Sequence, residues 1–140
     1  MGLTGVGYEG TDLETFVRCL RDAGVDIIVD VRLNPISRKR GFSKNALAAG
    51  LAEAGIGYRH MRALGNPKWN RPGFSGSPEE LGQARDLYAG EIRSEEARRC
   101  LDEIARLAHE SSVALLCFES DERRCHRDVV LGMVGYALLG

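Results

Sequence analysis

Two nearly uninterrupted apolar segments constrain the fold of this chain more than any other feature. They are Val25–Val31 and Val113–Phe118, and both are rich in the β-branched and aliphatic residues that favour strands. A strand that is exposed on one face alternates apolar with polar residues, whereas a strand covered on both faces does not. The two segments are therefore predicted to lie inside a parallel sheet.

Helical patterns separate these strands from two weaker ones, Leu3–Tyr8 and Ile56–Met61. Helices are expected after Thr11, after Ser43, from Ser77 to about Ala89, from Ser94, and from near Arg124. This alternation predicts an α/β fold, a three-layer sandwich whose mainly parallel central sheet is flanked by helices. The 140 residues fit one domain, residues 1–140.

Local signals predict where several helices begin and end. Thr11 with Glu14, and Ser77 with Glu80, have the spacing of a capping box, in which the first hydroxyl and the later carboxylate satisfy free amides. Gly24 is expected to end the first helix, because glycine enters the left-handed conformation without strain.

The sequence favours a cytoplasmic protein. No apolar run approaches the roughly 18 residues of a membrane span, and the N-terminus lacks the basic start and apolar stretch of a secretion signal. Disulfides are therefore not expected among the four cysteines. Cys19 and Cys100 fall in helical apolar patterns and are expected to be core thiols.

Charge is unevenly distributed along the chain. The net charge is −1, yet Val31–Ser75 holds nine basic residues and one acid, giving +8. Aromatic residues interleave with these charges, and Arg presents a planar fork that grips phosphate. The expected partner is an anionic small molecule or a nucleic acid, with no membrane. The alternative is a basic surface neutralised by acidic helices. The oligomeric state stays open, a homodimer included.

Candidate site residues follow the strands. Ligands of parallel sheets bind beyond the carboxyl ends of the strands, where helices begin. Asp30 ends the second strand and Glu119 follows the last, so each is a candidate general base or a group that orients a guanidinium. Asp30 is equally consistent with a structural role.

Cys125, His126 and Arg127 are predicted to occupy the first turn of the last helix, where the helix dipole favours an anion. The same field lowers the pKa of a thiol, so Cys125 is a candidate nucleophile and His126 a candidate proton carrier. The alternative is a buried cysteine beside a surface histidine.

The remaining candidates are assigned to ligand binding. A second anion cradle is expected in the basic connection Ser37–Lys44. The predicted ligand-binding residues are Tyr8, Arg32, Ser37, Arg38, Phe42, Ser43, Lys44, Tyr58, His60, Cys117 and Arg127. The spacing of Cys117, Cys125 and His126 matches no recognised zinc pattern, so neither a metal nor another cofactor is predicted.

Several motifs in order resemble the domain of unknown function 488 family. They are Asp30-Val31-Arg32 with Pro35, Ser37-Arg38, Gly41-Phe42-Ser43-Lys44, Gly55-Ile56 with Tyr58 and His60, Leu64-Gly65, Cys117-Phe118-Glu119 with Asp121, and Cys125-His126-Arg127. The resemblance runs from Gly7 to about Val134. It implies the fold and the site residues rather than a reaction.

Rhodanese-like sulfurtransferases are a weaker resemblance. They pair an Asp-x-Arg strand end with a cysteine after another strand, and Asp30, Arg32 and Cys117 would fill those places. The segment from Phe118 to Arg124 lacks the short, amide-lined cysteine loop of those enzymes.

Three functions are compatible with these residues. The first is an enzyme acting on a phosphate-bearing substrate, a nucleotide or a nucleic acid. The second is thiol or sulfur-transfer chemistry at Cys117 or Cys125. The third is a non-catalytic anion-binding module, which needs the arginines but no proton carrier.

Overall fold

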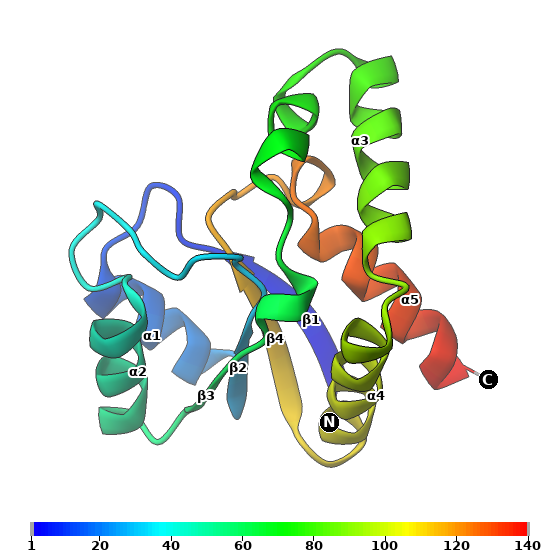
Figure 1. The fold of residues 1–140 in the computed structure, drawn as a ribbon. Helices are drawn as coiled ribbons and strands as arrows, with labels where there is room; N and C mark the ends of the chain where they lie inside the picture. Colours follow the sequence, from blue (N-terminus) through cyan, green and yellow to red (C-terminus); the bar gives the residue numbers. More distant parts are fainter. Residues whose placement is uncertain (1, 140) are drawn as a thin grey trace.

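Four parallel strands form the central sheet of the computed structural model, which describes residues 2–139 (Figure 1). The strands are β1 (Gly2–Gly7), β2 (Ile27–Asp30), β3 (Gly57–His60) and β4 (Ser112–Cys117). Their order across the sheet is β1-β4-β2-β3. The two apolar segments thus form the interior strands β2 and β4, as the absence of alternation predicts.

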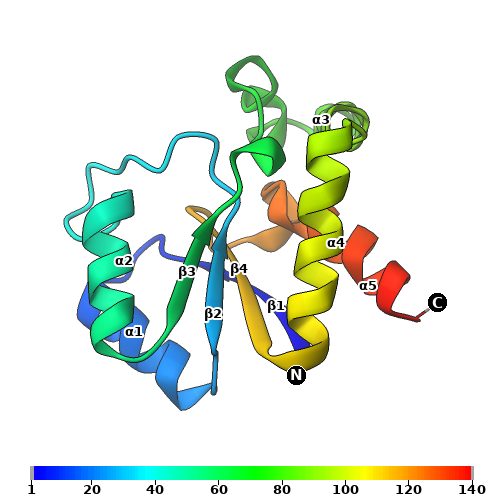
Figure 2. The ribbon, with the colours of Figure 1, turned by 60° about the horizontal axis from the view of Figure 1, so that its bottom comes forward.

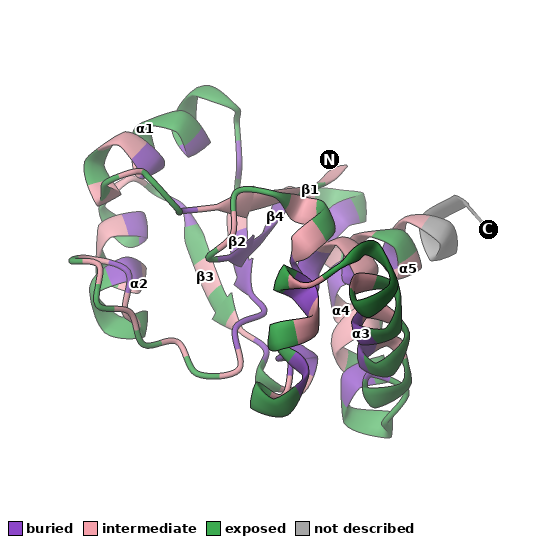
Figure 3. Cartoon of the chain, turned by 90° about the horizontal axis from the view of Figure 1, so that it is seen from above, coloured by how far each residue is buried: buried purple, intermediate pink, exposed green. Residues whose placement is uncertain are grey.

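Within residues 2–139, five α-helices cover the two faces of this sheet. They are α1 (Leu13–Asp22), α2 (Lys44–Glu53), α3 (Pro78–Glu91), α4 (Glu95–Glu110) and α5 (Arg127–Leu139). Helices α1 and α2 lie on one side, and α4 and α5 lie on the other, with α3 beside α5 (Figures 2 and 3). The predicted three-layer α/β architecture is confirmed. Among residues 2–139, no helix combines the length and the apolar character needed to cross a bilayer.

The interior strands contribute to a separate core on each face. Ile28, Ala114 and Leu116 pack with residues of α1 and α2, including Leu20 and Leu47. The neighbouring strand residues face the other way: Val29, Val113 and Leu115 pack with residues of α4 and α5, including Ile104 and Val130. Successive side chains of a strand point to opposite faces, so both faces must be apolar, which explains the continuous apolar segments.

Helix starts agree with the sequence at α3 and differ at α1. Ser77 and Glu80 form the predicted capping box of α3. The predicted capping box of Thr11 is wrong, because Asp12 is the cap of α1 and its carboxylate accepts the Thr15 amide at 2.7 Å. A carboxylate is the stronger acceptor and also complements the positive end of the helix. Gly24 ends the segment with φ +73°, as expected.

The last helix begins later than predicted. The chain forms a short 3₁₀ turn at Glu122–Arg124, in which Asp121 accepts the Arg123 amide, and α5 starts only at Arg127. Cys125 and His126 therefore precede the helix instead of occupying its first turn. Because the Asp121 carboxylate accepts a backbone amide in this turn, the turn competes with the helix for the same segment, and α5 begins after it.

Candidate functional site

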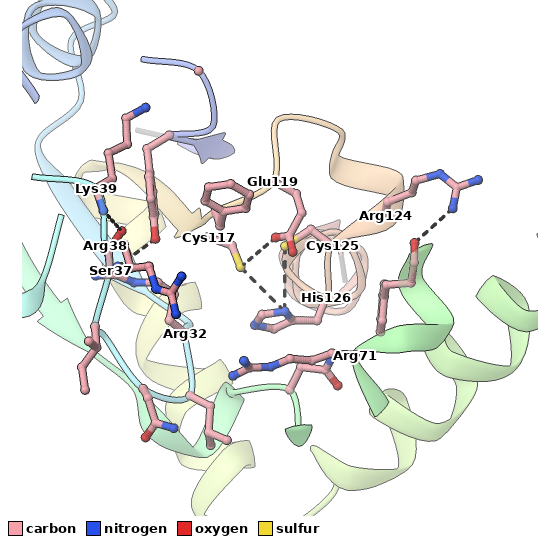
Figure 4. Close-up of a pocket in the computed structure, with 18 residues that line it drawn as sticks. Arg32, Ser37, Arg38, Lys39, Arg71, Cys117, Glu119, Arg124, Cys125 and His126 are labelled. Atoms are coloured by element: carbon pink, nitrogen blue, oxygen red, sulfur yellow. Dashed lines mark hydrogen bonds between the residues drawn. The ribbon is translucent and has the colours of Figure 1, made fainter. Parts of the chain in front are cut away.

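A cavity of about 600 Å³ opens at the carboxyl edge of the sheet (Figure 4). Its walls come from the segments that follow all four strands, the edge at which the sequence places the site. Eight predicted site residues line it: Tyr8, Arg32, Ser37, Arg38, Cys117, Glu119, Cys125 and His126. The other seven lie outside its wall, and the contacts of each are described below.

Arg32 is a wall residue whose charge is neutralised from behind. Asp30 is fully buried and accepts hydrogen bonds from Arg32 Nε at 2.9 Å and Nη2 at 2.7 Å. Arg32 Nη1 donates to the Tyr8 hydroxyl and to the Phe42 carbonyl. Burial by itself lowers the pKa of Arg32, but the contact with Asp30 outweighs it and the pKa is raised. Four of the five guanidinium N–H groups are used in this way.

Three predicted ligand-binding residues support this pair rather than the cavity. The Tyr58 hydroxyl donates to Asp30 Oδ2, and burial together with that carboxylate raises the pKa of Tyr58. His60 Nε2 lies 2.7 Å from the Arg32 carbonyl, so this nitrogen carries the proton and donates it. Phe42 is fully buried and stacks on Tyr8 with ring centroids 4.4 Å apart.

The connection before α2 is held together by its own hydroxyls. Ser43 Oγ accepts the Ser37 amide at 3.0 Å and donates to the Ser37 carbonyl, and the Lys44 amide donates to Pro35. Ser43 stands at the cap position of α2 without capping it through its side chain. Ser37 and Arg38 therefore reach the cavity, whereas Ser43 and Lys44 lie outside it.

Cys117, Cys125 and His126 form the floor of the cavity, and all three are buried. His126 Nδ1 lies 3.9 Å from Cys117 Sγ and 3.8 Å from Cys125 Sγ (Figure 4). His126 Nε2 is 2.7 Å from the Val31 carbonyl, which only accepts, so this nitrogen carries the proton. Neutral His126 consequently presents the lone pair of Nδ1 to both sulfurs.

The environment of this cluster favours a resting Cys117 thiol over a thiolate. The neighbouring Cys125 and burial both raise the pKa of Cys117, and His126 opposes them only in part. Burial lowers the pKa of His126, but the contact with Cys117 outweighs it and the net direction is upward. Glu119 Oε2 lies 3.2 Å from Cys117 Sγ, and because a carboxylate accepts, the thiol donates.

Arg127 is a structural residue, contrary to its predicted place in the anion site. Its side chain is 1% exposed and lies outside the cavity wall. Nη1 donates to the Glu119 carbonyl and Nη2 approaches the Ser120 carbonyl. Arg127 is the first residue of α5, and its side chain turns behind the Glu119–Ser120 segment, where it fixes the position of Glu119.

The remaining cysteines are separate from the cluster. Cys19 is exposed on α1, so its predicted burial is wrong, and Cys100 is half-buried on α4. The helical spacing of Cys19 places it beside the apolar face of α1, but α2 and the sheet do not cover that position.

A comparison with protein families identifies the chain. The model of the family "Domain of unknown function DUF488" matches residues 12–134. The chain belongs to the DUF488 family. No curated protein and no solved structure matches it. The family name carries no activity, so the function of this DUF488 domain has to be argued from the cavity.

The cavity of the DUF488 domain also contains cations that the site prediction omitted. Lys39 and Arg71 belong to the basic segment Val31–Ser75, so the high positive charge of that segment is the sequence feature that points to them. Nothing in the sequence places these two residues in the site. Arg124 lies outside that segment and donates to the Phe74 and Gly76 carbonyls at 3.1 Å. The arrangement combines a cationic rim with a floor that offers two thiols and an imidazole lone pair.

Proposed function

We propose that this DUF488 domain is an enzyme that binds a phosphate-bearing substrate, a nucleotide or the end of a nucleic acid, in the cavity. The observation that carries the proposal is the rim. Arg38 and Lys39 come from the connection between β2 and α2, Arg71 comes from the segment between β3 and α3, and all three line one cavity. Within residues 2–139 none of them forms a salt bridge to an acid. Unpaired cations around one hollow attract an anion.

The composition of the wall supports a phosphate group in particular. Glu119 is the one acid among the described lining residues, and the Cys117 thiol donates to it. Arginine binds phosphate through two parallel N–H groups, and Arg38 and Arg71 are exposed at the rim. A cavity of about 600 Å³ has the volume of a small-molecule site. Exposed aromatic surface, Phe118 at 43%, is available at the same wall for stacking a base.

The floor supplies the proton chemistry. His126 Nδ1 has a lone pair and is held by the bond from Nε2 to Val31, so it can accept a proton from a hydroxyl of the bound substrate. Glu119 lies beside it and is fixed through Arg127. Asp30, in contrast, acts by neutralising and orienting Arg32.

Thiol or sulfur-transfer chemistry is the less favoured function. It requires a thiolate at rest, whereas Cys125 and burial raise the pKa of Cys117. A non-catalytic anion-binding module shares the rim and differs only in making no use of His126.

Binding of a defined panel tests the proposal: inorganic phosphate, a nucleoside monophosphate, a nucleoside triphosphate and a short oligonucleotide. Isothermal titration at low and at raised salt is the measurement. The double variant Arg38→Ala/Arg71→Ala is compared with Arg40→Ala/Lys68→Ala, which removes the same charge from exposed residues outside the cavity. Hydrogen bonds between charged groups contribute about 1.5–3 kcal/mol each, so the first variant should weaken binding at least tenfold and the second only slightly.

Two results would contradict this function. If no member of the panel binds, or if both double variants weaken binding equally, the rim is not a phosphate site. Turnover of the bound members is then followed in the wild type and in His126→Gln. Binding without turnover in the wild type would assign the domain to the non-catalytic class.

A further inference from the structure

The floor of the cavity gathers three side chains of metal-ligating type from two separate segments. Cys117 ends β4, while Cys125 and His126 follow the 3₁₀ turn. Their sulfur and nitrogen atoms all lie within 4.8 Å of one another, and all three residues are buried. We propose that Cys117 Sγ, Cys125 Sγ and His126 Nδ1 bind a divalent zinc-type ion. This inference goes beyond the proposed function, because the ion needs no anionic substrate to bind. In the metal-bound form His126 Nδ1 is a ligand and no longer a proton acceptor, so a water bound to the ion would take over that role.

The distances fit an ion at the centre of the three atoms. With Zn–S of about 2.3 Å and Zn–N of about 2.0 Å, tetrahedral geometry places sulfur and nitrogen ligands about 3.5 Å apart. The observed separations from His126 Nδ1 are 3.9 Å to Cys117 Sγ and 3.8 Å to Cys125 Sγ. The two sulfur–nitrogen pairs therefore need to close by only a few tenths of an ångström. The two sulfurs lie within 4.8 Å of each other and need to approach to about 3.8 Å.

His126 is already oriented as a ligand. Metal-binding histidines commonly donate their second N–H to a carbonyl or carboxylate, which fixes the tautomer and aims the other nitrogen. His126 Nε2 donates to the Val31 carbonyl at 2.7 Å in this way. The ring also packs edge-on against Tyr88, with centroids 5.1 Å apart, so its orientation is held from two sides.

Charge balance selects the kind of ion. On binding, each of the two thiols releases its proton to solvent, and the two thiolates neutralise the two positive charges of the ion. The resulting group is neutral, which suits a buried floor where an uncompensated charge is costly. Two sulfurs and one imidazole prefer Zn²⁺ or Co²⁺ to the hard ions Mg²⁺ and Ca²⁺.

The fourth position faces the cavity, because all three ligands line it. Sites with three protein ligands and one open position are typical of catalytic zinc. Glu119 Oε2 lies 3.2 Å from Cys117 Sγ, so its carboxylate is the nearby protein group that can fill this position or bind a water there.

Titration of the reduced, metal-free chain with Co²⁺ tests the site, in the absence of any phosphate ligand so that the result is independent of anion binding. One equivalent should bind, with a thiolate-to-cobalt charge-transfer band and the intense visible bands of tetrahedral cobalt, and Zn²⁺ should displace it. About two protons should be released per ion. The spectrum should disappear in Cys117→Ser and in Cys125→Ser and persist in Cys19→Ser and Cys100→Ser, whose thiols lie outside the cluster.

A measurement on the wild type removes any dependence on how well the variants fold. Cysteine alkylation is followed by mass spectrometry with Zn²⁺ and with a chelator. Zn²⁺ should slow labelling of Cys117 and Cys125 at least tenfold and leave Cys19 unchanged. Absence of the charge-transfer band, its retention in Cys125→Ser, or alkylation that is insensitive to Zn²⁺ would each overturn the proposal.

Discussion

The buried pair of Asp30 and Arg32 makes a quantitative prediction about stability. Asp30 is fully buried and Arg32 is 6% exposed. The carboxylate accepts the Arg32 amide at 3.1 Å and two guanidinium nitrogens at 2.9 and 2.7 Å. Asp30→Ala removes these acceptors and leaves the guanidinium without a countercharge beneath the cavity wall.

The expected cost follows from that geometry. Breaking a buried ion pair by removing one partner costs about 3–5 kcal/mol, mostly because the other charge stays buried. For 140 residues, an unfolding entropy of about 2.1 cal/mol/K per residue converts this loss to a Tm decrease of about 10–17 °C. The loss is a large part of the roughly 5–15 kcal/mol that stabilises an ordinary domain.

Urea denaturation of a double-mutant cycle measures the pair. Asp30→Ala and Arg32→Met are combined, and the double variant should be more stable than the sum of the single losses predicts, by about 2 kcal/mol or more. The exposed pair of Glu95 and Arg99, 2.7 Å apart on α4, is the matched control and should show about 0.5 kcal/mol or less.

The prediction is refuted if each single variant lowers the free energy of unfolding by less than about 1 kcal/mol. It is also refuted if the losses of the two single variants add up to the loss of the double variant. Arg32 would then be free to bind a ligand instead of being committed to Asp30.

Two further predictions concern a glycine and a helix cap. A side chain at Gly7 would overlap the Glu119 carbonyl oxygen, so Gly7→Ala should destabilise the protein by about 1–3 kcal/mol in urea denaturation. Gly82 is exposed on α3 with open space around it, so the control variant Gly82→Ala should instead stabilise the protein by up to about 1 kcal/mol. Equal effects of the two variants would contradict the close approach of Gly7 to the Glu119 carbonyl. The Thr15 amide lowers the pKa of Asp12, so the cap contributes stability above the ordinary pKa of an aspartate and loses it as pH falls through the lowered value. The free energy of unfolding of the wild type should therefore fall relative to that of Asp12→Asn below about pH 4. If the two proteins lose stability in parallel as the pH falls, Asp12 does not cap α1 as a carboxylate.

Much of the architecture was readable from local sequence. The segments Val25–Val31 and Val113–Phe118 are almost entirely apolar, with Asp26 and Asp30 as the exceptions, so they are predicted to lie inside the sheet. Ser77 with Glu80 marks the start of α3. Parallel strands share one carboxyl edge, which is why residues that follow β2 and β4 meet at one cavity.

Within the site, sequence identified the residue types but not their partners. Arg32 and Arg127 look alike in a motif, yet Arg32 lines the cavity, whereas the guanidinium of Arg127 lies behind it at the Glu119 and Ser120 carbonyls. Cys117 and Cys125 matched no metal spacing, since one ligand ends a strand and the other follows a turn.

Sequence alone therefore determined the sheet, its two covered faces and the edge at which polar residues gather, because periodicity and strand direction are properties of short segments. Only the tertiary structure decided which side chains face the cavity. Asp30 pairs with Arg32, and His126 turns Nδ1 toward two sulfurs because Nε2 is held by Val31. These orientations depend on hydrogen bonds between segments that are far apart in the chain, and no local pattern records them.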